Sequence, residues 1–290
     1  MIYYLQDSHL NDSSAVLRVR GPDANTYLQG QFTQDLRLAA GESAYGLWLD
    51  QKGKVQADSQ VLKQAENEYL IACFSCKAAD LRSRLERYLI ADEVELEDLT
   101  ESWTGVLLWG EGAASIVPPA GAIALPSRRA GPGSRQWLVP AGSTAAIRST
   151  LGDGAVAADR AAAELARLRA AIPAVPVDIG PRDLPNEGGL DDGAISCTKG
   201  CYLGQEVMAR LKNLGQVRRR LHVVRGVGPV PAAGTALYQG ERKVGETRSA
   251  AADGDGFLAM AMLSLVNLDA AAGLAFTPGG GANLEILQRV

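Results

Sequence analysis

The sequence predicts an α+β protein that ends in a small all-β domain, and two observations lead to this prediction. Strand-like and helix-like patterns alternate through the first half of the chain. After about residue 215 the helix-like patterns stop, and short strand-like runs alternate with Gly and Pro turns, as in a small β-barrel or sandwich. The 290 residues are enough for one large domain or two smaller ones. We therefore predict two domains, at residues 1–214 and 215–290.

The elements of the first half follow from short-range patterns. Residues 15–20 alternate apolar and polar side chains, which is typical of a half-buried strand, and Pro22 then suits the first turn of a helix. Two apolar-rich runs flank a turn-forming sequence, DQKG, which predicts a hairpin. Leu81, Leu85 and Leu89 recur at helical spacing. The predicted strands are residues 15–20, 44–49, 55–62 and 69–74, and the predicted helices are residues 23–28 and 77–89.

The second half gives weaker patterns before the all-β region. Residues 110–154 are rich in Gly, Pro, Ala and Ser and are hard to assign. Residues 158–170 are rich in Ala and place Leu165 and Leu168 on one face, which predicts a helix. Four prolines between Pro173 and Pro185 then forbid regular structure, so a long ordered loop is expected. The further predicted strands are residues 103–109, 136–139, 217–225, 236–238, 243–248 and 256–262.

Composition and charge exclude several classes of protein. The formal net charge is −4, from 29 basic and 33 acidic residues. This balance argues against general nucleic-acid binding, which depends on pairing phosphates with Lys and Arg; we interpret the basic run at 218–220 as outward-pointing strand side chains. The N-terminus lacks the regions of a secretory signal, and no apolar run approaches the ~20 residues that span a bilayer. A cytoplasmic protein that does not bind membranes is therefore expected.

Four cysteines are present: Cys73, Cys76, Cys197 and Cys201. Thiols stay reduced in the cytosol. We therefore expect free thiols or ligands rather than a disulfide framework.

The segment with the most chemistry is KGCYLGQEVMAR, which begins at Lys199. Gly200 and Gly204 permit tight turns and a close backbone approach to a ligand. Residues from Gln205 onward favour a helix, so Cys201 is expected just before a helix N-terminus, where unpaired N–H groups carry partial positive charge. That charge and the Lys199 cation both favour the thiolate, which is the nucleophile and the metal ligand.

Simpler interpretations of the same residues exist. A free Cys is most often a small buried apolar residue, although the neighbouring Gly and Lys residues favour a functional Cys201. Glu206 and Arg210 are spaced i, i+4 and can pair on one helical face. If that pair lies at the surface, it contributes under about 1 kcal/mol.

KGCYLGQEVMAR resembles the signature of the YgfZ-type folate-binding proteins, which are relatives of the glycine-cleavage T-protein. The resemblance extends to residues 20–58, which include YLQGQ, Asp35 and an Asp-x-Lys-Gly-Lys turn at 50–54. It also includes residues 168–179 and 184–193, ahead of the Cys motif. Together these segments cover most of residues 15–225.

The resemblance implies a T-protein-like folate-binding domain, with pseudo-symmetric sheets and flanking helices around a central opening, followed by a C-terminal β-barrel. It implies tetrahydrofolate as the cofactor, bound in that opening, and iron–sulfur client proteins as partners, including enzymes that modify tRNA. The family's functional thiol corresponds to Cys201, with Lys199 beside it, and we expect it at the rim of the folate cavity. Gln205, Glu206 and Arg210 correspond to the rest of the motif.

Two positions depart from the transferase relatives. Those relatives carry an Asp-Asp doublet in the hairpin strand, and the corresponding pair here is Ala57-Asp58. Asp58 is then a general base or orienting carboxylate, or a solvent-facing strand residue. The relatives' pterin-binding Glu corresponds to Arg169, which offers only hydrogen-bond donors, so Arg169 is either a contact for the glutamate tail of folate or an exposed helix charge. Lys54, in the hairpin turn, is also a candidate folate contact.

Three functions remain open from the sequence. The leading one is a tetrahydrofolate-binding protein that supports iron–sulfur cluster assembly or repair through Cys201. The alternative is a tetrahydrofolate-dependent aminomethyl- or methyltransferase that uses Asp58 and Cys201, so the sequence does not decide whether the protein is an enzyme. In the third, the four thiols bind zinc or an iron–sulfur cluster, but their spacing is imperfect. His9 and His222 lack spaced partners, so no histidine-based metal site is predicted.

Overall fold

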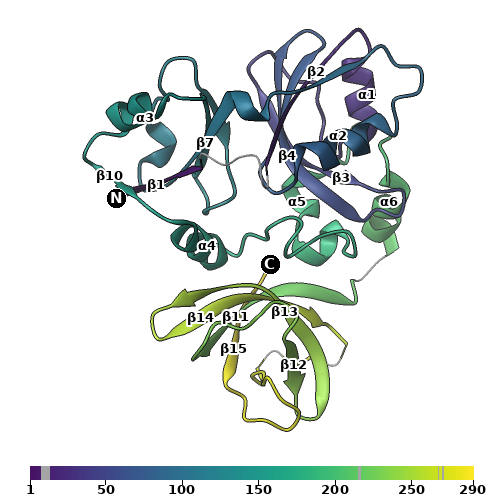
Figure 1. The fold of residues 1–290 in the computed structure, drawn as a ribbon. Helices are drawn as coiled ribbons and strands as arrows, with labels where there is room; N and C mark the ends of the chain where they lie inside the picture. The colour runs from purple at the N-terminus through teal and green to yellow at the C-terminus, as the bar shows by residue number, and fades with distance from the viewer. Residues whose placement is uncertain (8–13, 215–216, 267, 270) are drawn as a thin grey trace.

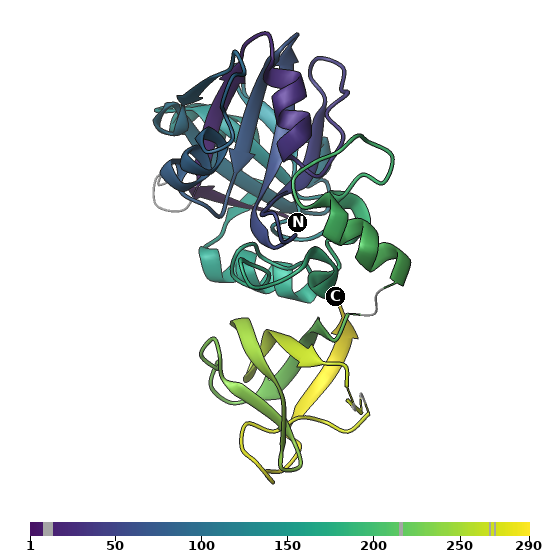
Figure 2. The ribbon, with the colours of Figure 1, turned by 90° about the vertical axis from the view of Figure 1, so that its right-hand side faces the viewer.

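The computed structural model describes residues 1–7, 14–214, 217–266, 268–269 and 271–290. Within these residues the strands form three five-stranded sheets. Two sheets lie side by side in the larger domain, and the third forms the C-terminal barrel beneath them (Figures 1 and 2). No helix in the described part of the chain is long and apolar enough to cross a membrane.

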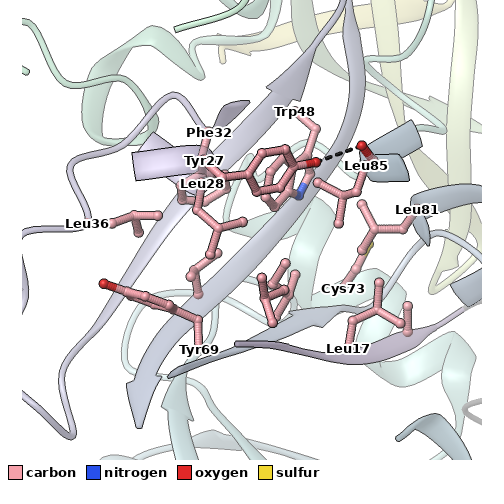
Figure 3. Close-up of a cluster of buried hydrophobic side chains, with 14 of the residues drawn as sticks. Leu17, Tyr27, Leu28, Phe32, Leu36, Trp48, Tyr69, Cys73, Leu81 and Leu85 are labelled. Carbon is pink, nitrogen blue, oxygen red and sulfur yellow. Dashed lines mark hydrogen bonds between the residues drawn. The ribbon is translucent and has the colours of Figure 1, made fainter. Parts of the chain in front are cut away.

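The first sheet has the strand order β3-β4-β5-β2-β6, and neighbouring strands are antiparallel. Helices α1 and α2 pack on one of its faces, around the buried Trp48 and Phe32 (Figure 3). Tyr27 of α1 donates a hydrogen bond from its hydroxyl to the Leu85 carbonyl at 2.7 Å, which joins the two helices. The elements are Ala15–Arg20 (β2), Ala24–Gln31 (α1), Ser43–Leu49 (β3), Val55–Ala65 (β4), Glu68–Cys73 (β5), Ala78–Glu86 (α2) and Glu95–Asp98 (β6).

The side chains of strand β4 point alternately to the two faces of this sheet. Successive side chains of a strand point to opposite faces. Ala57 and Val61 pack in the core beneath the helices, together with Trp48. Asp58 and Leu62 therefore lie on the other face, toward the second sheet, where Leu62 packs against residues of that sheet.

The second sheet has the order β10-β1-β7-β9-β8. Only the β1–β10 pair is parallel. Helix α3 packs on this sheet through the buried Ile147, and helix α4 follows β10. The elements are Ile2–Asp7 (β1), Thr100–Ser102 (η2), Trp103–Gly110 (β7), Ala113–Ser115 (η3), Ile123–Pro126 (β8), Arg135–Pro140 (β9), Thr144–Leu151 (α3), Ala155–Ala157 (β10) and Arg160–Arg169 (α4).

The chain then passes beneath both sheets to the helix that follows the Cys motif, Gln205–Leu214 (α6), and to the barrel. Residues 170–184 contain no helix or strand, as the prolines predict, and lie between the large domain and the barrel (Figure 1). The barrel sheet has the order β12-β13-β14-β11-β15. The elements are Pro185–Gly188 (η4), Asp191–Ala194 (α5), Gln205–Leu214 (α6), Arg219–Val227 (β11), Ala236–Gln239 (β12), Arg242–Asp253 (β13), Gly256–Ser264 (β14) and Leu284–Arg289 (β15).

Two buried carboxylates of the proline-rich segment tie the barrel to the large domain. Asp178 is fully buried; it accepts hydrogen bonds from the Ser249 hydroxyl and backbone N–H of β13, at 2.6 and 3.0 Å. Asp183 accepts a bond from the Arg219 guanidinium of β11 at 2.9 Å. The apolar core between the domains is also continuous, because Leu168 of α4 packs in one cluster with barrel residues. The proline-rich loop predicted from the sequence thus forms the connection between the domains.

The fold class predicted from the sequence is confirmed, and one prediction about the cysteines is wrong. Cys73 and Cys76 form a disulfide at the end of β5, so only Cys197 and Cys201 are free thiols, and both are exposed. The predicted boundary between residues 214 and 215 adjoins residues 215–216, which lie outside the described residues, and stays a prediction. His9 also lies outside them.

Candidate functional site

A cavity of about 410 Å³ lies where the two sheets of the large domain face helix α4. We call it the Asp58 cavity, because it contains the one hairpin carboxylate that the sequence singled out. Its wall combines both sheets, the loop between β8 and β9, helix α4 and the proline-rich segment. The lining residues include Tyr45, Asp58, Phe74, Leu107, Arg128, Arg129, Arg160, Glu164, Arg167, Val175 and Val177.

Asp58 is half-buried in this cavity and is held by Tyr45 of the neighbouring strand. The Tyr45 hydroxyl donates a hydrogen bond to Asp58 Oδ2 at 2.9 Å. Burial raises the pKa of Asp58 to about 6, although the Tyr45 hydrogen bond and the nearby Arg129 and Arg128 charges oppose the shift. Burial also raises the pKa of Tyr45 well above its usual value. Asp58 can therefore gain or lose a proton near neutral pH, which suits a general base or an orienting carboxylate.

Helix α4 presents one charged face to the cavity. Arg160, Glu164 and Arg167 lie on it at positions i, i+4 and i+7, as expected for neighbours on a helix. Arg167 is 4% exposed and forms an ion pair with Glu164. It also donates a hydrogen bond to Asp178 Oδ2 at 2.7 Å. Through this bond, the α4 wall of the cavity contacts the proline-rich segment that connects the domains.

Cations and apolar side chains complete the cavity. The Arg128 guanidinium lies 5.2 Å from the centre of the Tyr45 ring, and that of Arg129 lies 5.4 Å from the centre of the Phe74 ring. Among the residues that the structure describes, the cavity is therefore lined by four arginines and two carboxylates, Asp58 and Glu164. Such a site favours a ligand with an apolar ring system, several N–H donors and anionic groups.

The Cys motif packs elsewhere, on the turn of the β3–β4 hairpin. Gly204 has a φ of +85°, and a Cβ there would lie 2.6 Å from the Asp50 carbonyl oxygen. Only glycine therefore allows the helix start to approach the turn. Helix α6 then begins at Gln205, as predicted, and Cys201 precedes it as an exposed thiol. Cys201 is not among the residues that line the Asp58 cavity, so the expected position at its rim is not what the structure shows.

Lys199 has a structural role in the motif. Its side chain is 7% exposed, and Nζ donates to the carbonyls of Gln29, Phe32 and Gln34 at 2.9, 2.6 and 2.9 Å. These bonds use all three donors of the ammonium group, so none is left for the Cys201 thiol. Burial lowers the pKa of Lys199 to about 8. Lys199 therefore anchors the loop that carries Cys201 to the C-terminal end of α1.

The other predicted folate contacts do not come together around Asp58. Arg169 lies on the far side of α4, where it donates a hydrogen bond to Asp253 of the barrel at 2.5 Å. Lys54 donates to the Arg182 carbonyl at 3.1 Å. Glu206 and Arg210 form an exposed ion pair at 3.0 Å, which is the simpler of the two interpretations of that pair.

Gln205 belongs to a second cavity, of about 750 Å³, which we call the interdomain cleft. The cleft lies between the segment from η4 to α6 and the first and last strands of the barrel. Cys197 is on its wall, and Tyr202 and Met208, each 7% exposed, contribute to it. No group of three or more His, Cys, Asp or Glu side chains with metal-binding geometry occurs in the part of the chain that the structure describes.

Several residues of the Asp58 cavity were not predicted from the sequence. Tyr45 and Glu164 were missed, as were the arginines at positions 128, 129 and 160. One sequence pattern could have identified part of this site. On a helical projection of α4, Arg160, Glu164 and Arg167 share a charged face, which is separate from the apolar face of Leu165 and Leu168. Nothing local in the sequence marks the arginines of the loop between β8 and β9.

Comparisons with known proteins agree with this architecture. Residues 8–126 match the family described as the GCVT N-terminal domain, and residues 218–287 match the CAF17 C-terminal beta-barrel domain. The human mitochondrial iron–sulfur cluster assembly factor IBA57 is 30% identical over 276 residues, which cover 87% of this chain and 76% of that protein. The tRNA-modifying protein YgfZ of Aliivibrio fischeri is 30% identical over 254 residues, covering 82% and 76%.

The fold is also that of a solved transferase. The aminomethyltransferase T of the glycine cleavage system from Bartonella henselae superimposes with a TM-score of 0.82 over 99% of this chain and 85% of that one. Its sequence identity is 19%, so this similarity concerns the fold alone.

Proposed function

Because the chain belongs to the family of the iron–sulfur cluster assembly factor IBA57 and the tRNA-modifying protein YgfZ, we propose that it binds tetrahydrofolate in the Asp58 cavity and supports iron–sulfur proteins through Cys201. The observation that carries the folate proposal is the composition of the cavity. It has two carboxylates at an apolar wall, surrounded by four arginines.

The residues of the cavity fit a reduced folate. The pterin ring carries N–H and amino donors, and a carboxylate such as Asp58 or Glu164 can accept two of them. Phe74, Leu107 and Val175 offer apolar contact to the rings. Arg128 suits a carboxylate of the glutamate tail, which a guanidinium group binds in a bidentate manner, whereas Arg167 is already bonded to Glu164 and Asp178. The volume of about 410 Å³ is within the usual range for small-molecule sites.

The chain's own groups have distinct tasks in this proposal. Tyr45 holds the Asp58 carboxylate by its hydrogen bond, and the cavity shields that half-buried carboxylate from part of the solvent. Both carboxylate oxygens of Glu164 accept hydrogen bonds from Arg167, and their remaining acceptor capacity takes the place of the relatives' pterin-binding Glu, which corresponds to Arg169. Tetrahydrofolate would supply a nitrogen that carries a one-carbon unit. Asp58, with its pKa of about 6, can accept or return a proton beside that nitrogen.

A transferase that uses Asp58 and Cys201 on one substrate is less well supported. The exposed Cys201 is absent from the cavity lining, and the Lys199 donors are used by backbone carbonyls. We therefore favour a protein whose thiol meets a partner at the surface. The cytoplasmic location stays a prediction, because one relative is named as mitochondrial.

The role of Cys201 can be tested in cells that lack the protein. We expect Cys201→Ala to fold normally, because the thiol is exposed, and to abolish rescue of iron–sulfur enzyme activity. Thr198→Ala is the matched control in the same exposed loop, and rescue should be retained. The measurement is the activity of an iron–sulfur enzyme in extracts at matched protein levels. Full rescue by Cys201→Ala would remove Cys201 from the proposal.

A further inference from the structure

The interdomain cleft has a chemistry that the proposed function does not use. Its floor is apolar, from Ile195, Tyr202, Met208 and Leu211, and an exposed thiol, Cys197, is on its wall. At about 750 Å³ it is large enough for a small peptide-sized ligand. It lies between the large domain and the barrel, and domain interfaces are where ligand sites occur preferentially.

Charges of both signs line the cleft: Lys212 and two aspartates come from the large domain, and two arginines come from the barrel. Asp191 and Asp192 of α5 belong to the large domain, whereas Arg220 of β11 and Arg289 of β15 belong to the barrel. Arg289 lies opposite His222 in the β11–β15 ladder. Arg220 is two residues before His222, so the two arginines share one face of the sheet.

The two arginines repel each other. Burial lowers the pKa of Arg220 first, and the Arg289 charge lowers it further, whereas Asp191 opposes the shift. Arg220 Nε donates to the Val290 carbonyl at 2.7 Å. Among the described residues, no hydrogen-bonded ion pair joins either arginine to an Asp or Glu side chain. An anionic group placed between them would relieve the repulsion.

The thiol is held in a fixed position beside these charges. The Ser196 N–H donates to the Thr33 carbonyl at 3.0 Å, and Lys199 is anchored by its three bonds to the α1 region. Cys197 lies between these two anchors. It also lies close enough to Tyr202 for a Cys197 charge to raise the pKa of that phenol, after the larger effect of burial.

From this arrangement we propose that the interdomain cleft binds a small zwitterionic peptide thiol of the glutathione class and holds it as a mixed disulfide on Cys197. The arginines take the carboxylates of the ligand, Asp191 and Asp192 take its ammonium group, and the apolar floor takes its aliphatic parts. The site is separate from the Asp58 cavity, because the two share no lining residue.

The covalent step is a thiol–disulfide exchange with the oxidised ligand, here glutathione disulfide. The Cys197 thiolate attacks one sulfur of that disulfide, and a new S–S bond forms to Cys197. The original S–S bond breaks, and the other half leaves as glutathione thiolate, which takes up a proton. The bound disulfide is the oxidant, so one disulfide bond is lost and one is gained.

The test uses the full chain, with its exposed thiols reduced, in the Cys201→Ser variant, so that Cys197 is the free thiol followed. Intact-mass spectrometry measures the rate at which one glutathione is added from glutathione disulfide. We expect Arg289→Gln to slow this addition by about tenfold at low ionic strength, because the charge attraction is lost. The reaction with neutral 2-hydroxyethyl disulfide should be unchanged, which shows that the thiol is still accessible.

Two comparisons make the outcome decisive. Arg225→Gln changes an exposed arginine of the same strand outside the cleft, and the rate with glutathione disulfide should be retained. Cys197→Ser, with Cys201 intact, should react more slowly than Cys201→Ser. Equal rates for the two cysteine variants, or equal effects of the two arginine substitutions, would overturn the proposal. Asp58→Asn should leave the rate unchanged, so failure here is distinguishable from failure of folate binding.

Discussion

Replacement of Asp178 by alanine is expected to lower the free energy of unfolding by about 3–5 kcal/mol, because it leaves buried donors without their partner. The carboxylate is fully buried and accepts bonds from Arg167, from Ser249 and from the Ala174 N–H. Without the Asp178 carboxylate, the buried Arg167 guanidinium keeps its ion pair with Glu164 but loses the one with Asp178. The measurement is the midpoint of urea unfolding, followed by circular dichroism and by tryptophan fluorescence.

The matched control removes an exposed pair between α4 and β13, the two elements that Asp178 links through Arg167 and Ser249. Arg169 of α4 bonds to Asp253 of β13, and its side chain is 61% exposed. Arg169→Ala should therefore change the stability by under about 1 kcal/mol. If both substitutions cost the same, burial of the Asp178 network does not hold the domains together as described.

The second large effect concerns Asp58 and depends on pH. Burial raises its pKa from 3.8 to about 6, so the folded protein binds an extra proton between these two values. Stability from this group is therefore present at low pH and is lost as the pH rises through 6. Asp58→Asn stays neutral, so we expect it to raise Tm by about 2–4 °C at pH 8 and to have no such effect at pH 4.

The same substitution should weaken ligand binding while it stabilises the fold. Loss of a charged hydrogen-bond acceptor lowers affinity for tetrahydrofolate by about 10–100-fold. Asp153→Asn, at an exposed turn, should affect neither Tm nor binding. Thermal scans at both pH values and anaerobic ligand titrations provide the two measurements. A lower Tm at pH 8 would show that Asp58 serves the fold rather than the cavity.

Much of the fold is predictable from local sequence patterns. Where one face of a strand or helix is buried, apolar residues recur in the sequence at the spacing of that element. The alternation at 15–20 coincides with strand β2, and the DQKG turn correctly places the β3–β4 hairpin. Strands β1, β6, β8, β10 and β15 were missed. Strands β8 and β10 have only four and three residues. Strands β1, β6, β10 and β15 are defined by pairing partners far along the chain. Helix α3 lies in the Gly-, Pro- and Ala-rich segment, where propensity is ambiguous.

The site was only partly predictable, because spatial assembly rather than sequence spacing forms the cavity. Asp58 could be identified from the hairpin, but Arg128 and Arg160 reach the same cavity from distant segments. Position 169 was aligned with a pterin-binding Glu, yet the rotation of α4 is fixed by Leu165 and Leu168 packing in the core shared with the barrel. That rotation turns Glu164, not position 169, toward Asp58.

The most direct test of the central claim is an anaerobic calorimetric titration of the full chain with tetrahydrofolate. We expect saturable binding at one site per chain, retained in Arg169→Ala and weakened in Asp58→Asn. Absence of any binding heat and of any ligand-induced rise in Tm, with a correctly folded protein, would contradict it.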